Sequence, residues 1–203
     1  MQLKKSKLFA VGLFLVYFVL RILFDDRWRE ISPYYSYLFE AGIIGAAIFV
    51  YQKRTAFKWP NLQNLVTFGC VALVAGFGAH DTAGVFGILI PFNLEGFETL
   101  FLLLILAPVL EELLFRFALW EPLELFTKSG VVIVALTTLF FVSGHLMSYS
   151  YVPDEFKSFI VYQAMYVILL GIGAGFARLK YGMPTAILVH FFFNLGFFVS
   201  AKM

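Results

Sequence analysis

Long apolar runs, separated by short breaks that hold most of the charges, are the feature that most restricts how this chain can fold. A helix rises 1.5 Å per residue, so about 20 apolar residues cross the hydrocarbon core of a bilayer. Backbone groups in lipid must satisfy one another, which favours helices. The runs therefore predict an all-α, polytopic transmembrane helical bundle of about seven spans, within a range of roughly six to eight. The runs are 8–24, 35–51, 64–79, 97–120 with an extension toward Phe126, 131–147, 159–177 and 184–201.

The composition agrees with a membrane protein. Hydrophobic residues make up 61% of the chain and charged residues 14%, against roughly 45–50% and 25% in soluble domains. A globule of 203 residues could not hide so much apolar surface, and this length suggests a single integral membrane domain over 1–203. A further apolar stretch, 83–92, is too short to cross, so we expect a re-entrant or interfacial segment there. The sequence shows no basic stripe typical of nucleic-acid binding, and the one cysteine, Cys70, excludes an internal disulfide.

Lysine and arginine in the short connections predict the orientation of the bundle. Cytoplasmic connections carry the excess of these residues. With seven spans, four basic clusters fall on one side, and the opposite connections are mixed or acidic. We therefore expect a multi-pass protein of the cell (plasma) membrane with a cytoplasmic N-terminus and an outside C-terminus. The clusters are Lys4, Lys5 and Lys7; Lys53, Arg54 and Lys58; Lys128; and Arg178 with Lys180.

A few ionisable side chains lie inside the apolar runs. Such groups are costly in a bilayer and usually mark function or an internal pair. Glu40, in the second run, reaches the interface or pairs within the protein. The other members form the more informative set, because they occur in three separate runs. They are Glu111, Glu112 and Arg116 in the fourth run, His145 in the fifth, and His190 in the seventh, where Asn194 follows.

Spacing along a helix assigns these side chains to faces. Glu112 and Arg116 stand four residues apart with the acid first, which is the favoured order for an ion pair. Glu111 lies about 100° around the helix from Glu112, and the residue four positions after it is Phe115. A carboxylate placed in this way suits a general base. His190 and Asn194 share one face of the seventh run.

Three motifs in these runs occur in the order of a known family. They read EExxxR from Glu111 to Arg116, FxxxH from Phe141 to His145, and HxxxN from His190 to Asn194. The chain thereby resembles the CPBP family of CAAX prenyl proteases of type II and bacteriocin-processing (Abi) proteins, which are glutamate-type intramembrane endopeptidases. The resemblance covers 111–194, somewhat under half of the chain. Phe117 stands where many members of the family have glycine.

The resemblance implies an endopeptidase that hydrolyses a peptide bond within or beside the membrane. Glu111 and His145 would hold and activate the attacking water, and His190 with Asn194 would form the oxyanion hole. Glu112, Arg116 and Phe141 would maintain the shape of the site or contact the substrate. The partners implied are membrane lipid and a peptide or protein substrate, with lipidated or membrane-anchored substrates as one class, and no cofactor is implied. Water must reach such a site, so the spans are expected to enclose a hydrated cavity.

Two alternatives stay open at this point. Glu111, His145 and His190 could instead bind zinc, although no HExxH spacing occurs and asparagine is a poor zinc ligand. We favour metal-independent chemistry. The chain could also be a non-catalytic protein of the same fold with a role in immunity, scaffolding or transport.

Counting along the fourth run puts Glu111 about nine residues from Trp120, roughly 13 Å, so we expect the site in the cytoplasmic half of the membrane.

Overall fold

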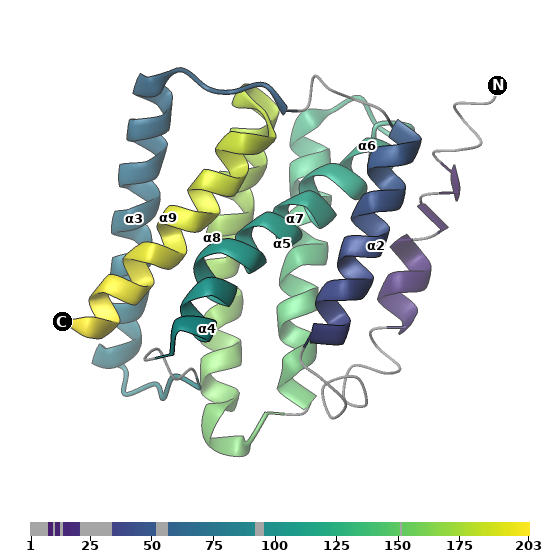
Figure 1. Ribbon diagram of the computed structural model, residues 1–203. Coiled ribbons are helices and arrows are strands. Elements are labelled where there is room, and N and C mark those ends of the chain that lie inside the picture. Colours follow the sequence, from purple (N-terminus) through teal and green to yellow (C-terminus); the bar gives the residue numbers. More distant parts are fainter. Residues whose placement is uncertain are drawn as a thin grey trace.

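The computed structural model describes residues 8–9, 11–12, 14–20, 34–51, 57–91, 96–150 and 152–203. Helices make up nearly all of this part of the chain, and it contains no strand (Figure 1). Residues 14–20 are helical as well, and Phe14 and Tyr17 in this stretch are buried. The α-helices that follow in chain order are α2 (Tyr34–Tyr51), α3 (Leu62–Val85), α4 (Phe97–Phe101), α5 (Ala107–Leu113), α6 (Trp120–Leu123), α7 (Gly130–Leu146), α8 (Lys157–Tyr181) and α9 (Met183–Lys202).

Five stretches of helix within the described ranges are long and apolar enough to cross a membrane. They are Tyr34–Tyr51, Leu62–Val85, Gly130–Ser150, Asp154–Tyr181 and Met183–Lys202. The prediction of an all-α membrane bundle is therefore confirmed. The count of about seven spans stays a prediction, because the first run is described only in part and the fourth is divided into short helical pieces.

The fourth run forms one inclined rod across the bundle (Figure 1). The helices α4, α5 and α6 alternate with two π-helical turns, Leu102–Leu106 and Leu114–Ala118. A π turn shifts each backbone hydrogen bond by one residue and often occurs at functional sites. The second turn directly follows α5, the helix that carries Glu111 and Glu112.

Two prolines in this rod leave backbone carbonyls to be satisfied by other helices. The Ala107 N–H bonds to the Leu102 carbonyl, and the next position, Pro108, has no N–H to offer to Leu103. The Asn194 side chain on α9 donates to the Leu103 carbonyl at 2.7 Å. Pro122 likewise stands four residues after Ala118, and the Tyr51 hydroxyl on α2 donates to the Ala118 carbonyl at 3.1 Å. These bonds attach the rod to α9 and to α2.

Close approach of α3 and α9 depends on glycine. A Cβ atom at Gly76 would lie 1.8 Å from the Phe193 carbonyl oxygen, and one at Gly196 would lie 2.0 Å from the Leu73 carbonyl oxygen. Small residues allow membrane helices to pack with their backbones nearly in contact. The backbone of α9, which carries His190 and Asn194, is therefore held firmly against α3.

The short apolar stretch 83–92 does not form a separate helix in its described part. Its first residues belong to the end of α3, which runs to Val85, and a turn at Phe86 and Gly87 follows. Gly87 has φ of +63°, a conformation that glycine adopts without strain. Residues 88–91 are irregular, and Phe92 lies outside the described residues. A re-entrant position in the bilayer stays a prediction.

Candidate active site

Three elements bring the four predicted catalytic side chains to one cavity. Glu111 on α5, His145 on α7, and His190 and Asn194 on α9 all line a cavity with a volume of about 600 Å³. His190 Nε2 lies 3.7 Å from Glu111 Oε2. Residues that are far apart in sequence therefore meet around a space large enough for water and a short stretch of peptide.

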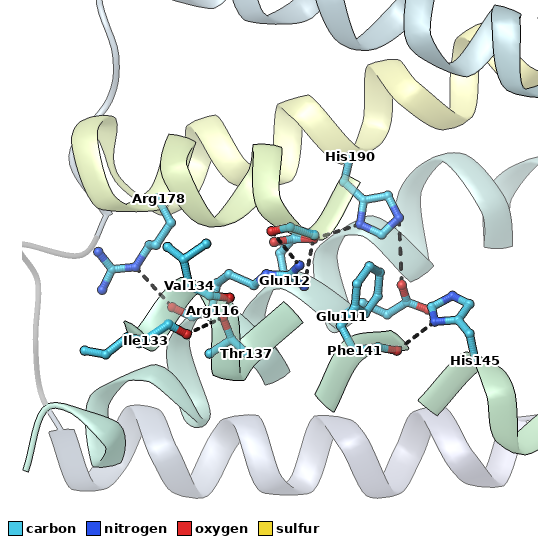
Figure 2. A network of polar contacts seen from close by, with 11 residues as sticks. Glu111, Glu112, Arg116, Ile133, Val134, Thr137, Phe141, His145, Arg178 and His190 are labelled. Atoms are coloured by element: carbon cyan, nitrogen blue, oxygen red, sulfur yellow. Dashed lines mark hydrogen bonds and ion pairs between the residues drawn. The ribbon is translucent and has the colours of Figure 1, made fainter. Parts of the chain in front are cut away.

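Glu112 links His190 to Arg116 beneath this cavity. Its Oε1 atom accepts from His190 Nδ1 at 2.9 Å and lies 3.4 Å from Arg116 Nη1 (Figure 2). Both members of this ion pair are fully buried, and Arg116 Nη2 also donates to the Gly171 carbonyl at 3.2 Å. The ion pair predicted from the spacing is therefore present. Glu112 also orients the His190 ring, a contact that spacing on one helix could not indicate.

Phe141, the first residue of the second motif, lies at the centre of the site. The Arg116 guanidinium stands 4.4 Å from the centroid of its ring, close enough for a cation–π contact. The same ring meets the His145 and His190 rings edge to face, with centroids 4.7 Å and 5.8 Å away. Phe141 thus packs against the Arg116 guanidinium and against both imidazole rings.

Hydrogen bonds assign the tautomers of the two imidazoles. His145 Nδ1 lies 3.0 Å from the Phe141 carbonyl oxygen (Figure 2). A carbonyl only accepts, so Nδ1 carries the proton and Nε2 is left as an acceptor in the neutral ring. His190 Nδ1 faces a carboxylate oxygen of Glu112 and is a donor for the same reason. In neutral form His190 then has Nε2 as an acceptor, whereas its imidazolium donates from Nε2 toward the cavity.

Asn194 has two candidate roles in this geometry. One N–H of its amide donates to the Leu103 carbonyl that Pro108 leaves without a helical donor. A side-chain amide has two N–H groups, so one remains as a donor for a ligand in the cavity. Any oxyanion contact by Asn194 must use that second N–H.

Residues outside the motifs also line the cavity. Glu40 on α2 is almost fully buried, and the Tyr17 hydroxyl donates to its Oε1 atom at 2.6 Å. The signal for Glu40 was an acidic residue inside an apolar run. Gln163 and Tyr166 on α8 line the same space. No pattern in the sequence marked these two, because one amide and one phenol in a long helix are ordinary.

The alternative zinc set was Glu111, His145 and His190. Within the part of the chain that the structure describes, no group of three or more His, Cys, Asp or Glu side chains is arranged to hold a metal ion. Metal-independent chemistry stays a prediction.

Comparison with known proteins gives one match. A family model described as type II CAAX prenyl endopeptidase Rce1-like matches residues 93–196, just over half of the chain. The matched region contains all three motifs and the whole inclined rod. No curated protein and no solved structure matches the chain.

Proposed function

Because the chain belongs to the type II CAAX prenyl endopeptidase Rce1-like family, we propose that it is an intramembrane endopeptidase that hydrolyses a peptide bond within or beside the membrane. The observation that carries this proposal is the meeting of Glu111, His145, His190 and Asn194 around one cavity. Amide hydrolysis needs a base for water, a proton donor for the leaving amine and donors for the developing oxyanion. These four side chains offer each of those groups.

The first step uses Glu111 and His145. The Nε2 atom of His145 accepts a hydrogen bond from the attacking water, since Nδ1 is engaged with the Phe141 carbonyl. Glu111 removes a proton from the water as its oxygen forms a bond to the carbonyl carbon of the substrate. The product of this step is a tetrahedral intermediate with a negatively charged oxygen, and the proton resides on the Glu111 carboxyl.

The second step uses His190 and Asn194. The His190 imidazolium donates from Nε2 to the oxyanion, and Asn194 donates its second amide N–H. Glu112 accepts from Nδ1 of the same ring at 2.9 Å, which holds the ring in this orientation. Glu111 then gives its proton to the amine nitrogen as the C–N bond breaks. Loss of one oxyanion donor typically lowers the rate by about 100- to 1000-fold.

The remaining motif residues act as positioning residues in this proposal. Glu112 holds His190, Arg116 balances the charge of Glu112, and Phe141 packs against Arg116 and both imidazoles. None of them needs to touch the scissile bond. Their variants should change the orientation of the imidazoles rather than remove a reacting group.

A comparison of membrane peptides tests the activity. Cells with the Glu111→Gln or His145→Ala protein should accumulate uncut peptides that wild-type cells release. Glu155→Gln is the matched control, because Glu155 is an exposed acid that belongs to none of the motifs and does not line the cavity. Protein levels are measured in parallel by immunoblot. An identical peptide set in wild type and Glu111→Gln, at equal protein levels, would instead favour the non-catalytic alternative of an immunity, scaffold or transport protein.

A double variant separates the two roles of Asn194. Asn194→Ala removes both an oxyanion donor and the donor to the Leu103 carbonyl. Pro108→Ala restores a backbone N–H to the rod and with it a donor for that carbonyl. If Asn194 stabilises the oxyanion, peptide release stays low in the double variant although the fold recovers. Full recovery of release would reduce Asn194 to a structural residue.

The chain is an integral membrane protein, and its place and orientation are part of the proposal. The connections α2–α3, α6–α7 and α8–α9 meet at one end of the bundle, and α3–α4 and α7–α8 meet at the other (Figure 1). Lys58 and Lys128 lie in the first group of connections, and Arg178 and Lys180 lie in the last turn of α8. The positive-inside tendency supports a plasma-membrane protein with this end, and the N-terminus, in the cytoplasm. The substrate is a peptide or protein at the membrane, with lipidated or anchored chains included.

A further inference from the structure

The cavity extends from the site toward one end of the bundle only. Its lining beyond Glu111 comes from the first turns of α2 and α4 and from the α3–α4 and α7–α8 connections. Representative positions are Ser36, Thr99, Pro91 and Ser148. Among the described residues that line it, none comes from 57–61, from 124–129 or from the junction of α8 and α9. The lining residues therefore point to an opening at the end where α2 and α8 begin. Figure 1 shows the first turns of these two helices at the same end of the bundle.

The opposite end is closed by buried side chains. Glu112 and Arg116 have no exposed surface, and Phe117 and Trp120 are only 1% and 2% exposed. Arg178 covers them from α8, because its Nε atom donates to the Arg116 carbonyl at 3.1 Å and its guanidinium lies over the Trp120 ring. Figure 2 shows the contacts that lead from Arg178 through Arg116 and Glu112 to His190. Water or peptide entering from this end would have to displace the ion pair itself.

The closed end is also the basic end. Its connections carry Lys58 and Lys128, and the α2–α3 connection contains Lys53 and Arg54 in the sequence. The connections at the open end are mixed or acidic, and Asp154 and Glu155 stand there beside Lys157, the first residue of α8. An excess of Lys and Arg marks the cytoplasmic side of short connections. The charges therefore place the closed end in the cytoplasm and the mouth of the cavity outside.

We infer that the site takes its substrate from the extracytoplasmic side of the membrane. The substrate class is then an extracytoplasmic peptide segment at the membrane surface, and not a cytoplasmic tail. This inference rests on the proposed peptidase function. A cavity of about 600 Å³ falls within the roughly 300–1000 Å³ of typical ligand pockets and admits a few residues of extended peptide.

This direction differs from the expectation that the site lies in the cytoplasmic half. That expectation counted residues along each run as if every helix stood upright. The rod α4–α6 and α9 are inclined in the bundle (Figure 1). His145 is the penultimate residue of α7, close to the end where the cavity opens. The number of residues from the end of one helix therefore does not give the membrane depth of a residue on a neighbouring helix with a different tilt.

Cysteine labelling in intact cells tests the direction without any need for activity. In a Cys70→Ala background, single cysteines replace Lys128 at the closed end, Glu155 at the open end and Ser148 in the cavity lining. A membrane-impermeant maleimide should label the Glu155→Cys and Ser148→Cys proteins in intact cells. The Lys128→Cys protein should be labelled only after permeabilisation.

Each other outcome overturns the inference. Labelling of Lys128→Cys alone in intact cells would reverse the orientation. Labelling of Glu155→Cys without Ser148→Cys would show that the cavity is not reached from outside. In the peptide comparison, the fragments lost in Glu111→Gln should derive from extracytoplasmic segments, and cytoplasmic fragments would contradict the inference while leaving the peptidase proposal intact. An unchanged peptide set with the expected labelling would instead refute the peptidase proposal and the substrate class with it.

Discussion

Replacing Arg116 by alanine should leave the buried Glu112 carboxylate without its ion-pair partner. Arg116 and Glu112 are both fully buried, 3.4 Å apart, and Glu112 Oε2 has no hydrogen-bond partner among the described residues. Without the guanidinium, the Glu112 charge keeps only its bond to His190. Removing one partner of a buried ion pair typically costs about 3–5 kcal/mol in the free energy of unfolding. We expect a loss of this size for Arg116→Ala, measured by unfolding in mixed detergent micelles.

The double variant Glu112→Leu/Arg116→Met removes both charges and keeps most of the buried volume. Uncharged replacements of buried ion pairs are often neutral in stability, so most of the lost free energy should return. Peptide release should stay low, because His190 has lost the carboxylate that orients it. Asp154→Ala is the control: it breaks an exposed ion pair with Lys157 and should leave unfolding unchanged.

Two results would refute this reasoning. If the double variant is as unstable as Arg116→Ala, the lost free energy of unfolding comes from packing against Phe141 and not from an unpaired Glu112 charge. If the double variant is stable and releases peptides at the wild-type rate, Glu112 does not position His190. The two readouts are independent, so each claim can fail alone.

Three further predictions concern packing, proline and metal. Gly76→Ala should weaken α3–α9 packing and lower the free energy of unfolding by about 1–3 kcal/mol. Gly78→Ala has open space around its Cβ atom and should be neutral or slightly stabilising. Thermal unfolding of the two variants compares them. Tyr51→Phe leaves the Ala118 carbonyl without its donor and should cost about 1–3 kcal/mol, and adding Pro122→Ala should restore most of this; a persistent deficit would contradict the proline argument. A strong chelator should leave peptide release unchanged, and inhibition that zinc reverses would contradict the metal-independent reaction.

The apolar runs and the three motifs could be interpreted without a structure. Each run must hide its backbone from lipid, so run length predicts helices directly. The pair Glu112 and Arg116 could be predicted because both residues lie on one helix, where spacing determines distance. The meeting of Glu111, His145 and His190 was expected from the family resemblance, and no spacing within one run could have shown it.

The sequence by itself therefore determined the helical class of the chain and the motif residues on each run. Only the tertiary structure decided that Glu40 shares the cavity, that Asn194 satisfies the Leu103 carbonyl, and that the cavity opens at the end away from the basic connections. The physical reason is that helix tilt and rotation are set by packing against neighbours, and not by the length of an apolar run. Contacts between helices depend on that tilt, so their geometry emerges only when the helices are assembled.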